Sequence, residues 1–238
     1  MRVIHGVKTV PIKKFIRETI LIAKKDLTIE RSTGEIVTTT GFFAVLLVVL
    51  SSRAFWTYTA EFDALLAPGV IWLSVTFASV LGLSRSWTRE REEGALRGLV
   101  VSPLSRGAIF LGKSIGVLAF ITAIEVIVVS TAALLLGFDL GRYVGALAVI
   151  AFLANVGIAA TGTLFGAMTV RTRARDLVLA SVLLPLLAPT LITAIVATRD
   201  LFSGTPFREL GDYFELMLVF DVVFTAAGID LFGLLIEG

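Results

Sequence analysis

The sequence predicts an all-α integral membrane protein with six membrane-spanning helices. Of its 238 residues, 56% are apolar and only 17% are charged, and the mean hydropathy is +0.92. A soluble globular domain carries about 25% charged and under about 50% apolar residues. The apolar residues also form continuous blocks of about the 20 residues that a helix needs to cross a hydrocarbon core of roughly 30 Å. A soluble enzyme domain is therefore excluded, and the blocks are too long for the strands of an outer-membrane barrel.

The predicted spans are residues 36–58, 64–84, 108–137, 143–170, 177–198 and 213–236. They leave little chain outside the bilayer, so we expect residues 1–238 to form a single transmembrane domain. The chain contains no cysteine and has a formal net charge of +2. These values exclude a disulfide scaffold and do not indicate a nucleic acid as partner. The segment before the first span lacks the pattern of a cleaved signal peptide.

The distribution of lysine and arginine predicts the orientation of the spans. Residues 1–31 carry eight of these basic residues, residues 85–113 carry six, and residues 171–175 carry three. The loops on the other side contain only Arg53, Arg142, Arg199 and Arg208. Because basic loops stay on the cytoplasmic side, we expect both termini and the loop at 85–106 to be cytoplasmic.

Residues 10–28 are predicted to form an amphipathic helix in the membrane interface. Pro11 suits a first helical position, and apolar side chains from Ile12 to Leu27 share one face, although Ile20 and Leu21 interrupt the stripe. Five basic residues occupy the opposite face: Lys13, Lys14, Arg17, Lys24 and Lys25. Such a helix would lie against anionic headgroups; a simple positive-inside anchor is the alternative.

The loop at 85–106 is too long and too highly charged for a simple connection. Acidic residues at 90, 92 and 93 precede apolar residues at 96, 99 and 100, and Pro103 ends the run. This order predicts a short helix with an apolar edge that docks into a groove of another protein. A solvated charged loop is the alternative.

The same loop carries a family resemblance. Its pattern Glu90-Arg-Glu-x-Gly-x-Leu-x-x-Leu-x-x-Ser-Pro103 resembles the cytoplasmic loop of ABC-2-type exporter permeases. Ala67-Pro-Gly-Val-Ile-Trp-Leu73 and Leu184-Pro-Leu-Leu-Ala-Pro189 are similar to the CcmB type of this group, the haem exporter B subunits of cytochrome c maturation. The resemblance extends over residues from about 12 to 200.

The resemblance implies an ABC-2-type permease subunit in a bacterial-type cytoplasmic membrane, with a coupling helix that contacts a separate ATPase subunit. The residues implied in this coupling are Arg91, Glu92, Glu93, Gly94, Leu96, Leu99, Ser102 and Pro103. The chain itself would not be an enzyme, because the partner hydrolyses the ATP. The implied partners are a second copy of the chain, a haem-handling membrane subunit and membrane lipids. The implied function is haem export or ATP-driven release of a haem-loaded chaperone; an exporter of a lipid, polysaccharide or drug is the alternative.

Residues Gly107–Ser114 match the phosphate-binding pattern G-x-x-x-x-G-K-[ST]. A phosphate loop follows a strand and bends so that its amides face the phosphates. Here no strand precedes the motif, and its apolar middle leads straight into the third predicted span. We therefore reject it as a nucleotide site.

Polar side chains inside a membrane are costly and mark functional positions by default. Glu125, Asn155 and Asp221 lie within predicted spans. For Glu125 both a functional role and a structural pairing stay open. Arg53 is one candidate partner of Glu125 and Asp221. Use of these residues for ion coupling would indicate a secondary transporter, but the paired broken helices of those folds are not visible.

Haem ligation by this chain is not expected. Axial haem ligands are His, Cys, Met or Tyr, and the chain has one histidine, His5, and no cysteine. Haem ligands would therefore come from a partner. Gly162 and Gly166 have the small-xxx-small spacing of close helix packing, either within the subunit or at a dimer seam. Pro185 and Pro189 indicate a hinge or a static kink.

Overall fold

The computed structural model describes residues 11–54, 60–92, 94–169 and 175–237. This described part contains helices and no strand, and six helices are long and apolar enough to cross a membrane. The all-α six-span prediction is thus confirmed. The spanning helices are α2 (Glu35–Ala54), α3 (Ala60–Glu92), α5 (Arg106–Leu136), α6 (Leu140–Thr169), α7 (Arg175–Phe202) and α8 (Gly211–Glu237). A short 3₁₀ helix, η1 (Phe207–Leu210), precedes α8.

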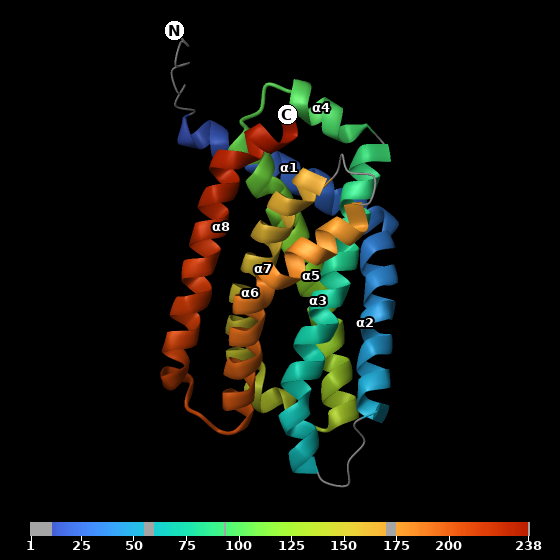
Figure 1. Cartoon of the computed structure of the whole chain (residues 1–238), viewed down its shortest axis with the longest axis vertical. Coiled ribbons are helices and arrows are strands. Elements are labelled where there is room, and N and C mark those ends of the chain that lie inside the picture. The colour runs from blue at the N-terminus through green and yellow to red at the C-terminus, as the bar shows by residue number, and fades with distance from the viewer. Residues whose placement is uncertain (1–10, 55–59, 93, 170–174, 238) are drawn as a thin grey trace.

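The spanning helices run up and down in one bundle, and two further helices lie at one end of it (Figure 1). These are α1 (Ile12–Thr33) and the short α4 (Ala95–Val101). The last turns of α8 reach the same end. We call this end of the bundle the α4 end.

Helix α1 is longer than the predicted 10–28. It continues to Thr33, where Gly34 takes a φ of 59° and donates its amide to the Glu30 carbonyl at 2.6 Å. A left-handed conformation of this kind favours glycine, and it turns the chain directly into α2. Ile20 is 57% exposed and Ile16 is 51% exposed. Ile20 therefore extends the outward apolar stripe and does not interrupt it.

Helix α3 corrects the predicted boundary between the second span and the loop at 85–106. Residues 85–92 are the last turns of α3, which continues to Glu92 and has 33 residues. At about 1.5 Å per residue such a helix is longer than the hydrocarbon core is thick. The loop proper is therefore shorter than predicted, and it contains α4.

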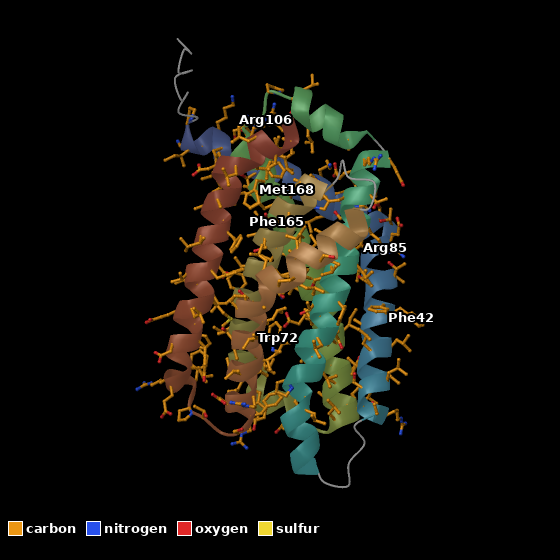
Figure 2. The ribbon with its side chains drawn as sticks, viewed as in Figure 1. Phe42, Trp72, Arg85, Arg106, Phe165 and Met168 are labelled. Atoms are coloured by element: carbon orange, nitrogen blue, oxygen red, sulfur yellow. The ribbon has the colours of Figure 1, made fainter. Side chains whose placement is uncertain are left out.

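Close packing between the helices depends on small residues of α6. A Cβ atom on Gly162 would overlap the side chain of Leu83, and one on Gly166 would overlap the indole of Trp87, both on α3. The spacing of these two glycines thus serves packing within the subunit. Trp72, labelled in Figure 2 in the interior of the bundle, adds a hydrogen bond of 2.9 Å from Nε1 to Thr198 on α7.

The outer surface of the bundle is apolar, as a lipid-facing surface should be. Phe42 points away from the bundle (Figure 2) and is 73% exposed. Helix α7 continues through Pro185 and Pro189, and its first part is tilted relative to the rest (Figure 1). A bend is the expected effect of proline inside a helix; whether it serves as a hinge stays a prediction.

We expect Gly166→Ala to lower the stability of the protein by about 1–3 kcal/mol, because the buried indole of Trp87 cannot yield without disturbing the α3–α6 contact. Thermal unfolding in detergent, followed by tryptophan fluorescence, measures the effect. Gly145→Ala is the matched control on the same helix, since nothing lies within 4 Å of its added Cβ. Equal unfolding temperatures for the two variants would contradict this account of the packing.

Candidate coupling site at the α4 end

The connection between α3 and α4 depends on one glycine. Gly94 has a φ of 66°, a left-handed conformation that other residues adopt only with strain. Its amide donates to the Arg91 carbonyl at 3.2 Å, and its own carbonyl accepts the Gly98 amide at 3.4 Å. Gly94 therefore ends α3 and starts α4 across the end of the bundle (Figure 1).

The inner side of α4 is fixed to the bundle through Leu99. This side chain is 8% exposed and belongs to a cluster with Ile22, Trp87 and Phe232. Two donors meet the Leu99 carbonyl: the hydroxyl of Ser102 at 2.7 Å and Nη1 of Arg106 at 3.1 Å. The helix is thus held at its C-terminal end by both apolar and polar contacts.

This placement corrects the predicted apolar edge of the loop helix. Leu99 packs inside its own chain, so it is not presented to a partner. Among the described side chains of α4, that of Val101 is apolar and 85% exposed. Hydropathy alone could not distinguish the two, because the direction of each depends on how α4 lies on the bundle.

Some of the predicted coupling residues are exposed on either side of α4 along the chain. Exposed at this end are Arg91, Glu92, Gly94, Gly98, Val101 and Pro103, and Ser102 is half-buried. Glu93 lies outside the described residues, and Leu96 belongs to α4 although its side chain is not described. The arrangement is a short helix with one side anchored and the other available to another protein.

Beneath α4, an ion cluster ties α3 to α1 and α5. Nζ of Lys113 on α5 lies 2.6 Å from Oε1 of Glu90 on α3, and 3.4 Å from Oδ2 of Asp26 on α1. Nζ of Lys25 lies 3.1 Å from the same Glu90 oxygen and 3.1 Å from Oδ1 of Asp26. We call these four residues the Lys113 cluster.

The charges of the Lys113 cluster stabilise one another because they are largely removed from water. The side chains of Lys113 and Glu90 are 5% and 9% exposed. Burial lowers the pKa of Lys25, whereas the neighbouring carboxylates of Asp26 and Glu90 raise it. Together the carboxylates outweigh burial, so the pKa lies above its ordinary value. Lys25 therefore stays charged, and its interaction weakens only at a pH above that of ordinary lysine titration.

A second contact joins α1, α2 and α3 nearby. Oε1 of Glu30 accepts the amide of Val37 at 2.9 Å, and Oε2 of Glu30 lies 3.6 Å from Nη1 of Arg89. Glu30 thus links the first turn of α2 to the last part of α3. With the Lys113 cluster, it fixes the position of the helix that leads into α4.

The phosphate-loop pattern has a structural explanation. Residues Gly107–Ser114 lie within α5, as the rejection of a phosphate loop required. Gly112 faces Thr19 and Ile22 of α1 so closely that a Cβ would overlap them. Lys113 is engaged with Glu90. The glycine and lysine of the pattern therefore join α1, α3 and α5.

Two of the predicted intramembrane polar residues meet each other. Nδ2 of Asn155 on α6 donates to Oε2 of Glu125 on α5, and both side chains are buried. Of the two roles left open for Glu125, the structure shows a structural pairing, and its partner is Asn155. Asp221 on α8 is also buried and faces Gly157 of α6.

The suggested pairing of the acids with Arg53 is not formed. Arg53 lies in the last turn of α2, whereas Asp221 is on α8, and these helices stand at opposite sides of the bundle (Figure 1). Glu125 is instead hydrogen-bonded to Asn155. Residues 170–174, which include two of the three basic residues counted at 171–175, lie outside the described residues.

Sequence reasoning missed Lys25, Glu90 and Lys113 as one cluster. Glu90 belongs to the loop motif, and Lys113 to the basic residues that predict the orientation and to the rejected phosphate pattern. A usable signal was present, because a lysine at the start of an apolar span needs a counter-charge at the same depth. The partner could not be chosen from the several acids nearby in sequence.

Comparison with known proteins agrees with this architecture. The model of the CcmB protein family matches residues 17–229. A protein named heme exporter protein B, from Pseudomonas aeruginosa, is 24% identical over 188 residues, which cover 79% of this chain and 83% of the relative. The matched region contains all of α4 and the whole Lys113 cluster.

We expect Lys113→Met to destabilise the protein by about 3–5 kcal/mol, because it leaves the Glu90 carboxylate buried without its nearest counter-charge. Replacing both partners, as Lys113→Met with Glu90→Leu, should cost much less than the sum of the single changes. Denaturant unfolding in detergent gives the double-mutant cycle. Lys24→Met, at an exposed position of α1, is the control. Additive effects would show that the two side chains do not act as a pair.

Proposed function

Because this chain belongs to the CcmB family, whose model matches residues 17–229, we propose that it is the membrane permease subunit of a haem-export complex. Its six apolar helices make it a multi-pass membrane protein. We further propose a bacterial-type cytoplasmic membrane, with α1, α4 and the C-terminal end of α8 on the cytoplasmic side. The concentration of lysine and arginine at this end supports that orientation.

A separate ATPase subunit drives the complex by binding to the exposed side of α4. The observation that carries this step is the two-sided character of α4, with Leu99 buried in the bundle and Val101 exposed. A detached loop would move without moving the bundle. Here α4 follows directly from α3, whose end is held to α1 and α5 by Glu90. Motion of the ATPase at α4 would therefore displace whole helices.

The chain uses the energy of ATP without binding ATP itself. The phosphate-loop pattern at 107–114 is helical and packed against α1 and α3. Among the coupling residues, Arg91 and Glu92 offer charges to the ATPase surface, and Gly94 and Ser102 set the ends of α4. In this division of roles, the partner hydrolyses ATP and this subunit changes its conformation.

The haem itself is held by a partner. His5 lies outside the described residues, Met217 is buried in the core, and Tyr213 donates its hydroxyl to Asp200 at 2.7 Å. We propose that two copies of this chain act with a haem-handling membrane subunit. ATP hydrolysis in this complex produces a conformational change that releases a haem-loaded chaperone.

We expect a photo-crosslinker at position 101 to capture an ATPase in the intact cell, because Val101 is an apolar residue of α4 that is 85% exposed. Purification in mild detergent and mass spectrometry identify the adduct. A crosslinker at Ile12 of α1, which is 77% exposed at the same end, is the control and should capture less of the ATPase. Labelling of position 101 from outside the cell would overturn the proposed orientation and the docking together.

We expect Gly94→Pro to leave ATP hydrolysis by the complex active and to abolish chaperone release, because proline cannot adopt the positive φ that joins α3 to α4. Purified complexes reconstituted in vesicles allow both quantities to be measured. Gly98→Ala is the matched control, since its Cβ meets nothing within 4 Å and it has no positive φ. Unchanged release in Gly94→Pro would contradict the coupling role of this connection.

A further inference from the structure

A pocket of about 340 Å³ lies between α1, α2, α3 and α5 near the α4 end. Its charged lining residues are Asp26, Glu30, Arg31, Arg89 and Lys113. Its apolar lining includes Val37, Val117, Phe120 and Ala123. It is distinct from the exposed side of α4, so the ATPase contact proposed above does not occupy it.

The lining changes from charged to apolar along one direction. On α5 the lining begins with Lys113 and ends with Ala123. At about 1.5 Å per residue these positions are separated by about 15 Å along the helix. Arg31 and Glu30 lie at the end of α1, at the charged end of the pocket. The pocket therefore extends from the level of the lipid headgroups into the level of the acyl chains.

The charged end of the pocket has side chains of both signs. Glu30 and Arg89 form an ion pair there, with Oε2 and Nη1 3.6 Å apart, and both residues line the pocket. Arg31 lines the same end and is exposed. Carboxylates and guanidinium groups in one lining are complementary to a headgroup that carries both a positive and a negative charge.

We propose that this pocket binds one phospholipid with a primary ammonium headgroup. The ammonium donates to the carboxylates of Asp26 and Glu30, and the phosphate accepts from the guanidinium groups of Arg89 and Arg31. An acyl chain follows the apolar wall toward Ala123. A purely anionic headgroup would be repelled by the carboxylates of Asp26 and Glu30, so the mixed charges favour the zwitterionic lipid.

The site acts on the helix that leads into α4. Trp87 and Arg89 line the pocket and lie on the last turns of α3. A headgroup that contacts both Arg89 and Arg31 would add a second link between α3 and α1 to the ion pair of Glu30 with Arg89. The bound lipid thus stiffens the connection beside the Lys113 cluster. This inference goes beyond the proposed function and holds for any cargo of the permease.

The test measures lipid retention by the full-length protein with native mass spectrometry during titration in detergent. The probes are phosphatidylethanolamine, phosphatidylglycerol and phosphatidylcholine of identical acyl chains. We expect phosphatidylethanolamine to bind about fivefold to tenfold more tightly than the other two. Equal affinities for the three lipids would overturn the proposal.

Two variants locate the binding. Arg31→Gln removes a phosphate donor, and Ala123→Leu fills the apolar end of the pocket; each should weaken phosphatidylethanolamine binding about fivefold or more. Arg17→Gln on α1 and Ala226→Leu on α8 are the controls, since both positions are exposed and neither lines the pocket. All four changes are at exposed positions, and unfolding in lipid-free detergent verifies the fold.

Two results would overturn the assignment. Undiminished binding in both pocket variants would place the lipid elsewhere on the bundle. Full competition by soluble glycerophosphoethanolamine would show that the pocket takes a free zwitterion, because the apolar wall would then contribute nothing.

Discussion

The buried ammonium group of Lys113 holds the α4 end of the molecule together. It lies at the start of an apolar span and contacts Glu90 on α3 and Asp26 on α1. A charge removed from water is stable only beside its counter-charges, so these three helices must keep their mutual positions. Gly112 supports the arrangement, because its missing side chain lets α1 approach α5 closely enough for the ions to meet.

This constraint gives α4 a rigid base. One end of α4 continues from α3 through Gly94, and its other end is fixed by Leu99 and by the guanidinium of Arg106. A force on the exposed side of α4 therefore acts on α3 and α5 at once. A flexible loop of the same composition would absorb that force in its own backbone, so the burial of Leu99 favours a mechanical role.

The sequence predicted the spans well and the contacts between them poorly, for a physical reason. Six spans follow from hydropathy, because the bilayer imposes a length of apolar chain on each helix. The extension of α3 to Glu92, the inward direction of Leu99 and the pairing of Lys113 depend on where helices distant in sequence meet. The partner of Glu125 could not be chosen for the same reason, although its need for a partner was evident.

Helix α5 links the coupling end to the middle of the membrane. Lys113 fixes it to α3 and α1, and Glu125, about 18 Å further along the helix, accepts a hydrogen bond from Asn155 on α6. In hydrocarbon, breaking this second contact would expose two polar groups without partners, which is costly. A displacement of α3 is therefore easier to accommodate by moving α5 and α6 together than by separating them. If α4 moves as proposed, the two polar contacts of α5 make it the element that would transmit this motion to the interior of the bundle.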